Sequence, residues 1–218
     1  METYNIAAAL IAMANLQPHA LAIAIPEKNR LDKNGMPRYK KVSFKELAFE
    51  TACVARGLLA AGFERGDRVV MMVPPGLNFF ILAFSMLQTG IVPVFIDPGI
   101  GMTNLKTCIA ETEPAGFIGI SKAHIARVLM SWGKKTIHKT VTIGPRLFWG
   151  GKKMQSLRNF DRSSKPVPVF DAGPDDIAAI IFTSGSTGLS KGVVYSHGNF
   201  KAQLRMIRDT FGFSPGEI

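Results

Sequence analysis

The sequence predicts an α/β fold in which βαβ units build a mainly parallel sheet. Short apolar runs of five or six residues recur along the chain, and segments of about 10–20 residues with helical periodicity separate them. Gly, Pro or Asp residues follow most of these runs. Strands that alternate with helices in this way pair in parallel, because each helix carries the chain back across the sheet. The chain has 218 residues, 47% hydrophobic and 19% charged, which is typical of a globular protein with one large domain or two small ones.

The first half of the chain contains the clearest helix signals. Ser43 and Glu46 have the spacing of a capping box, and Gly62 fits the C-cap, so a helix is expected over 43–62. The segment 76–90 is apolar nearly all round, which predicts a buried helix. The other helices expected here are 5–15, 103–112 and 121–132, the last capped by Ser121. The expected strands are 21–25, 68–74, 92–97, 116–120 and 140–144.

A stretch rich in Pro, Ser, Gly and Asp then interrupts the alternation. We interpret this stretch, 161–176, as a connection between two subdomains. Residues 1–160 would form the first α/β subdomain, and 177–218 would begin an incomplete second one. The second begins with strands at 177–182 and 192–196 and a helix at 198–212.

The chain is basic, with a net charge of +10, and the charge is concentrated in two regions. Seven Lys and Arg residues lie in 28–45, and nine lie in 134–165. We interpret 28–41 as a solvated loop and 134–165 as a solvated surface, with an anionic small molecule or partner as the alternative. No aromatic residues alternate with the charges, and no helix-turn-helix or zinc spacing is present, so nucleic acid is not an expected partner.

Two features bear on the cellular compartment. Cys53 and Cys108 lie in apolar helical patterns and are expected to be reduced core residues, which favours the cytoplasm. The apolar run near the N-terminus has only about nine residues and no preceding Lys or Arg, so it predicts neither a signal peptide nor a membrane span.

The segment "IIFTSGSTGLSKGVVYS" predicts a phosphate-binding loop between two strands. Two glycines let the backbone approach a ligand closely, and four hydroxyl groups and a nearby lysine can donate hydrogen bonds to it. Ser190 precedes Lys191, Gly192 follows it, and a strand comes next, so the loop is not a Walker A motif. The expected phosphate-binding residues are Thr183, Ser184, Gly185, Ser186, Thr187, Gly188 and Lys191.

On these residues, "FTSGSTGLSKGVVYSHGNF" resembles the signature loop of the adenylate-forming enzymes, which include acyl-CoA synthetases, luciferases and peptide-synthetase adenylation domains. Ser190 stands where that family usually has proline. The resemblance extends over essentially the whole chain. Within the family, "VFIDPGIG", "FIGISKAHIARV" and "TIGPRLFWGGKKM" resemble the beta-lactone synthetases of bacterial long-chain olefin biosynthesis.

The resemblance implies a fold, the adenylate-forming N-terminal domain, and a two-step reaction. ATP and a carboxylic acid, with Mg²⁺, would give an acyl-adenylate and pyrophosphate. A CoA thiol or the substrate's own 3-hydroxyl would then capture the adenylate. Thr183 to Gly188 would hold the β- and γ-phosphates, and Lys191 would be catalytic by supporting them with its charge.

The resembling family also has motifs that bind adenine and ribose, and a mobile C-terminal domain. These have no counterpart in the 218 residues. We therefore expect the isolated chain to be truncated and inactive, and to expose apolar surface through which it could associate. A free-standing nucleotide- or pyrophosphate-binding module, or a non-functional gene fragment, is the alternative.

Other polar residues have simpler interpretations. His197 is expected to pack at, or cap, the helix that follows it, and Asp97 is expected to close a turn after a strand. His19, His124 and His138 are scattered without metal-ligand spacing, so no metal ligand is expected.

Overall fold

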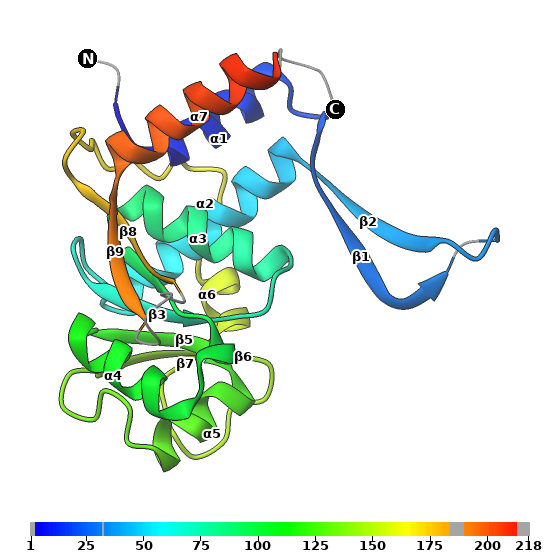
Figure 1. Cartoon of the computed structure of the whole chain (residues 1–218). Helices are drawn as coiled ribbons and strands as arrows, with labels where there is room; N and C mark the ends of the chain where they lie inside the picture. Colours follow the sequence, from blue (N-terminus) through cyan, green and yellow to red (C-terminus); the bar gives the residue numbers. More distant parts are fainter. Residues whose placement is uncertain (1–2, 32, 184–189, 213–218) are drawn as a thin grey trace.

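The computed structural model describes residues 3–31, 33–183 and 190–212, and its centre is a mainly parallel sheet (Figure 1). In chain order the strands of this sheet are β3 (Arg68–Met72), β4 (Val92–Phe95), β5 (Gly116–Ile120), β6 (Lys139–Ile143), β7 (Lys152–Lys153), β8 (Ile177–Thr183) and β9 (Lys191–Ser196). In space they follow the order β7-β6-β5-β3-β4-β8-β9. All neighbours are parallel except β8 and β9, which are antiparallel. The predicted α/β fold class is confirmed.

Helices cover both faces of the sheet. They are α1 (Ala7–Leu16), α2 (Phe44–Ala60), α3 (Leu77–Thr89), α4 (Met102–Thr112), α5 (Ser121–Leu129), α6 (Met154–Phe160) and α7 (His197–Phe211), with a short 3₁₀ turn η1 (Pro98–Ile100). Alternate residues of β3 enter different cores: Val69 and Met71 pack with α2, α3 and α6, whereas Val70 and Met72 pack with α4 and α5. A strand buried on both faces needs apolar residues throughout, which explains the continuous apolar run. No helix among the described residues has the length and apolar character needed to span a bilayer.

Local signals determined the start of α2 correctly, whereas the helix ends two residues before the predicted end. Ser43 Oγ accepts from Glu46 N, and Glu46 Oε2 accepts from Ser43 N at 2.8 Å, which completes the capping box. Gly62 has φ +84° and follows the C-cap residue, Ala61. The prediction for Ser121 is wrong: it is the first residue of α5, and its Oγ donates to Pro145 O instead of capping the helix.

The interpretation of 28–41 as a loop is also wrong. β1 (Leu21–Leu31) and β2 (Pro37–Ser43) form an antiparallel hairpin that projects from the body of the molecule (Figure 1). Five of the seven residues of β2 are exposed, so the alternation of apolar and polar residues that marks a half-buried strand is absent. The hairpin is a separate two-stranded sheet, and Val42 at its base is buried in the main core.

The region 134–165 is not only a solvated surface, because β7 and α6 lie within it. Met154 and Leu157 of α6 are buried against α2. The helices can approach closely because Gly57 of α2 has no side chain: a Cβ built there would lie 2.6 Å from the Leu157 Cα. A helix of seven residues is too short for its periodicity to be recognised in the sequence.

The segment 161–176 has no helix or strand and lies against α2 and α3. Arg56 of α2 donates hydrogen bonds to the carbonyl oxygens of Asp161, Ser163 and Lys165, at 2.7–3.1 Å. The side-chain amide of Gln88 of α3 donates to Val167 O at 2.8 Å, and the main-chain carbonyl of Gln88 accepts from Phe170 N. These contacts satisfy the backbone groups that an irregular segment leaves without secondary-structure partners. The division at this segment into two subdomains stays a prediction.

Two histidines and both cysteines are buried. Cys53 and Cys108 are free thiols in the core. His124 lies under a parallel Trp149 ring, and one of its ring nitrogens, Nε2, is 3.0 Å from Val141 O. His197 packs edge-on against Phe170. Burial lowers the pKa of both histidines, since the charged ring loses its hydration; the hydrogen bond to Val141 opposes this for His124, and Asp176 opposes it for His197.

These two lowered pKa values predict that the fold loses stability in mild acid. Below the ordinary histidine pKa, the unfolded chain binds protons that the folded chain does not, so the free energy of unfolding falls as pH drops from about 6.5 towards 5. The slope is at most about 1.4 kcal/mol per pH unit for each histidine. Urea unfolding at pH 7.5 and pH 5 measures it, and His124→Gln should reduce the difference. An unchanged difference in this variant would contradict the assignment to His124.

Candidate functional site

The carboxyl ends of the central strands form an edge where the chain changes direction. The loop after β3 leads to α3 on one face of the sheet, whereas the loop after β4 leads through η1 to α4 on the other. Neighbouring parallel strands whose connections leave to opposite faces open a crevice between them, and ligands of α/β proteins bind in such crevices. β8, which pairs with β4, ends at the same edge.

The predicted phosphate loop connects β8 to β9 at this edge. Thr183, the last residue of β8, pairs directly with Lys191, the first residue of β9. Both side chains are exposed, and Lys191 forms no salt bridge with a described residue. The strand-to-strand connection expected from the sequence is therefore confirmed. Ser184, Gly185, Ser186, Thr187 and Gly188 lie outside the described residues.

Gly192 brings the two strands of this hairpin together. A Cβ at Gly192 would lie 2.9 Å from the ring of Phe182, its cross-strand partner. Phe182 itself is buried in the core between the sheet and α4. The glycine after Lys191 thus lets the aromatic ring of β8 pack beneath the start of β9, and this fixes the backbone that carries Lys191.

The second strand leads into α7, whose first turn is fixed to the segment before β8. Asn199 Oδ1 accepts from Ser196 N at 2.9 Å and Asn199 N donates to Ser196 Oγ, which forms a capping box. Gly198 N donates to Pro174 O at 2.9 Å. His197 is buried and its backbone N–H donates to Asp176 O at 3.0 Å, so it packs as expected, while Ser196 is the cap.

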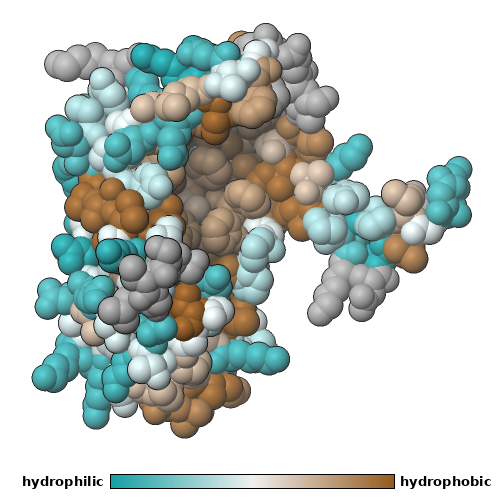
Figure 2. All heavy atoms as spheres, viewed as in Figure 1, coloured by the Kyte–Doolittle hydropathy of each residue, from teal (hydrophilic) through white to brown (hydrophobic). Residues whose placement is uncertain are grey.

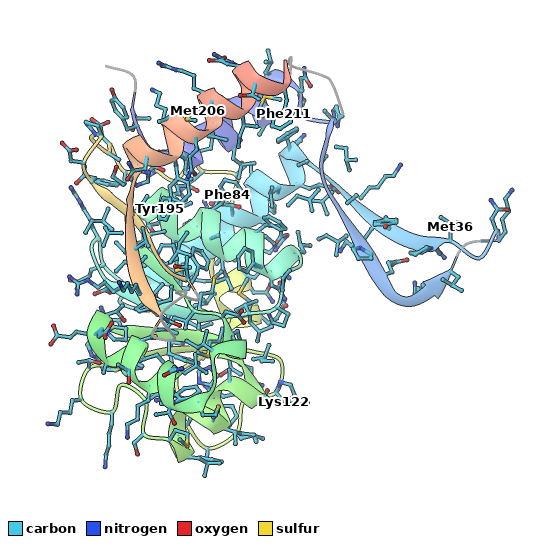
Figure 3. All side chains as sticks on the ribbon, in the orientation of Figure 1. Met36, Phe84, Lys122, Tyr195, Met206 and Phe211 are labelled. Atoms are coloured by element: carbon cyan, nitrogen blue, oxygen red, sulfur yellow. The ribbon has the colours of Figure 1, made fainter. Side chains whose placement is uncertain are left out.

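An apolar cleft of about 680 Å³ opens beside the ends of β3, β4 and β8. Figure 2 shows it as the brown hollow beneath α7. Aromatic residues of α3 and β4 (Phe79, Phe80, Phe84 and Phe95) line it together with Phe200 of α7. Phe84 is labelled on α3 in Figure 3. Asp97 is the one charged residue among the described residues that line the cleft.

The helix expected to be buried, 76–90, is only partly so, and the Met and Phe residues around it divide between the core and the cleft. Met71 is 3% exposed, but Phe80 is 36% exposed and lines the cleft. The signal that could have indicated a cleft is the run "FFILAF" at 79–84, which is apolar on every side of a helix. Asp97 has the structural contact expected for it: its Oδ1 accepts from Gly99 N at 2.8 Å.

No group of three or more His, Cys, Asp or Glu residues that could hold a metal ion occurs in the described part of the chain. The described site therefore consists of Thr183 and Lys191 at the end of a hairpin, next to an apolar cleft. An exposed ammonium group opposite a hydroxyl, at the carboxyl edge of a sheet, can bind an anion such as a phosphate group.

Comparison with known proteins adds independent findings. A family model described as AMP-binding enzyme matches residues 14–218. The olefin beta-lactone synthetase of Stenotrophomonas maltophilia is 40% identical over 215 residues, which cover 98% of this chain and 38% of that protein. The chain thus spans well under half of the length of this relative.

Two solved structures illustrate that the fold is shared with known proteins. A long-chain-fatty-acid-CoA ligase from Archaeoglobus fulgidus superposes with a TM-score of 0.80 at 20% identity, covering 98% of this chain and 41% of that one. ATP-bound MatB from Rhodopseudomonas palustris superposes with a TM-score of 0.76 at 25% identity, covering 98% of this chain and 39% of that one.

Proposed function

Because the chain belongs to the AMP-binding enzyme family, we propose that it is the N-terminal part of an ATP-dependent ligase that forms acyl-adenylates. The observation that carries the proposal is the pairing of Thr183 with Lys191 at the carboxyl end of β8, at the two ends of a loop rich in Gly, Ser and Thr. The position of this hairpin at the edge of a parallel sheet, where α/β proteins bind ligands, supports it.

The proposed chemistry places charge where this hairpin can stabilise it. A carboxylate oxygen attacks the α-phosphorus of ATP, the bond to the bridging oxygen breaks, and pyrophosphate leaves with the bond electrons. Lys191 and the backbone of the loop would stabilise the charge that builds on the leaving group. We propose Thr183, Ser184, Gly185, Ser186, Thr187, Gly188 and Lys191 as the residues that contact the β- and γ-phosphates.

We propose a fatty acid or a 3-hydroxy fatty acid as the carboxylic acid. The 40% identity to an olefin beta-lactone synthetase over nearly the whole chain supports a 3-hydroxy acid, whose hydroxyl would attack the adenylate carbonyl and release AMP. Capture by a CoA thiol is the second possibility, supported by the acyl-CoA ligase fold. Mg²⁺ would accompany ATP in this reaction, and no group of three or more His, Cys, Asp or Glu residues in the described part of the chain would hold it. Cys53 and Cys108, both free, support the cytoplasm as the compartment.

The relatives contain a portion that has no counterpart in this chain. We further propose that the apolar cleft and the exposed face of α7 are the surfaces that would contact such a portion. Leu204, Met206, Ile207 and Phe211 of α7 are each at least 47% exposed. An apolar surface of this extent on a separate chain favours association.

A chimera with a relative tests the proposed reaction. We expect a chimera, in which these 218 residues replace the corresponding part of the S. maltophilia relative, to exchange radiolabelled pyrophosphate into ATP when the carboxylic acid is present. The isolated chain should give no exchange above background. A folded chimera that lacks exchange would refute the ligase assignment, and exchange by the isolated chain would refute its expected inactivity.

The product that the chimera forms shows whether the substrate's own hydroxyl or a CoA thiol captures the adenylate. With a 2-alkyl-3-hydroxy acid and ATP alone, mass spectrometry should detect a product lighter than the acid by one water, which is the beta-lactone. Turnover that requires CoA and yields a thioester would assign the chain to the acyl-CoA ligases instead.

A further inference from the structure

The hairpin of β1 and β2 is the most basic projecting surface of the described structure. Its outer part, 26–41, has six Lys and Arg residues against two Asp and Glu residues. Arg30, Lys33, Arg38, Lys40 and Lys41 all have exposed side chains. One carboxylate, Glu27, is shared by Arg30 at 3.7 Å and Arg38 at 3.6 Å. With six cationic against two acidic residues, the outer hairpin keeps a formal net charge of +4.

Large apolar side chains lie among these charges. Leu31 is 63% exposed, Met36 62% and Tyr39 54%. Figure 3 labels Met36 at the far end of the hairpin, well away from the sheet. Leu31 and Met36 flank the turn that joins the strands, where Gly35 has φ +75°. Apolar side chains at the tip of an arm, surrounded by cations, form an amphipathic surface.

We propose that this hairpin is a membrane-surface anchor, and that its partner is an anionic phospholipid bilayer. The lysines and arginines would lie among the lipid phosphates, while Leu31 and Met36 would enter the boundary between headgroups and acyl chains. Tyr39 suits the same depth, because its ring is apolar and its hydroxyl stays hydrated. The body of the chain would then stand beside the bilayer, tethered by an arm.

The composition of the arm favours lipid over other anionic partners. A surface for single-stranded nucleic acid would use aromatic rings for base stacking, and the outer hairpin has only Tyr39. Lysines on exposed strands also prevent edge-to-edge pairing of sheets, but that role does not call for exposed aliphatic side chains at the tip. The combination of cations with Leu31 and Met36 is what a bilayer interface requires.

Vesicle sedimentation tests the proposal with the purified chain. We expect binding to phosphatidylcholine vesicles in which about a third of the lipid is phosphatidylglycerol, and at least about 10-fold weaker binding to phosphatidylcholine alone. Raising the salt from about 0.1 M to about 0.5 M should weaken binding, because the Debye length shortens. Equal binding to the two vesicle types would overturn the proposal.

Matched variants locate the binding surface. Lys33→Glu with Lys41→Glu should weaken binding at least about 10-fold, whereas Lys134→Glu with Lys135→Glu, an equal change of net charge in another exposed segment, should change it less than about 3-fold. Leu31→Ser with Met36→Ser should also weaken binding, and Leu129→Ser with Met206→Ser, which are similarly exposed elsewhere, should not.

Other results would refute the assignment. If the two double charge-reversal variants lost vesicle binding equally, binding would depend on the net charge of the chain and not on the hairpin. Binding to polyuridine that depends on Lys33 and Lys41, without binding to anionic vesicles, would make the arm a nucleic-acid contact. Light scattering would identify the hairpin as a dimer contact if the mass doubled with rising concentration only in chains with an intact hairpin, and if these chains did not bind vesicles.

Discussion

Replacing Lys191 by alanine is expected to lower kcat/KM for ATP in the chimera by about 10- to 100-fold, while the fold stays intact. A hydrogen bond to a charged group contributes about 1.5–3 kcal/mol, and a loss of that size in the transition state gives a change of this order. The fold should not respond, because Lys191 is exposed at the first position of β9 and forms no salt bridge with a described residue. Pyrophosphate exchange and thermal unfolding measure the two quantities.

The matched control is Lys106→Ala, which removes an exposed lysine from α4 and the same charge from the protein. It should leave kcat/KM within about 2-fold of the parent, because a screened charge outside the site contributes little. If Lys191→Ala kept full activity, or if the two variants lost activity equally, the proposed role of Lys191 would be wrong.

Gly57→Ala is expected to lower the free energy of unfolding by about 2–3 kcal/mol, although alanine is the better helix former. Gly57 is buried in α2, and its missing side chain is the space into which the backbone of α6 fits. A Cβ would meet the backbone of Leu157, which cannot rotate away as a flexible side chain could. The helices would have to separate, and the buried Leu157 and Met154 would lose contacts with α2.

Gly173→Ala provides the control for this substitution. A Cβ at Gly173 would lie 3.6 Å from Asp176 Oδ2, an ordinary contact distance, so the free energy of unfolding should change by less than about 0.5 kcal/mol. Urea unfolding followed by circular dichroism gives both values. A Gly57→Ala chain as stable as the parent would show that α6 can move without cost.

Local sequence signals were sufficient wherever one residue or one short pattern controls the conformation. The Ser43–Glu46 capping box fixed the start of α2, and the continuous apolar run at 69–72 required a strand buried on both faces. The start of α2 and this strand depend on neighbours in sequence, and so the sequence reveals them. The proposed phosphate loop rests on the same kind of local pattern, because two glycines, five hydroxyls and Lys191 within nine residues favour anion binding.

The features that could not be predicted from the sequence depend on contacts between separate segments of the chain. The hairpin of β1 and β2 forms although neither face of its outer half is buried, so no periodic pattern marks it. Whether Phe80 lies in a core or on a cleft depends on which elements cover α3, and these include Ala179 of β8 and Phe200 of α7, about 100 residues away or more. Likewise Thr183 and Lys191 meet through the strand register, which is a property of two chain segments and the hydrogen bonds between them. The residue types thus determined most of the elements and are the basis of the proposed phosphate site, whereas the contacts between distant segments determined the shape of the cleft.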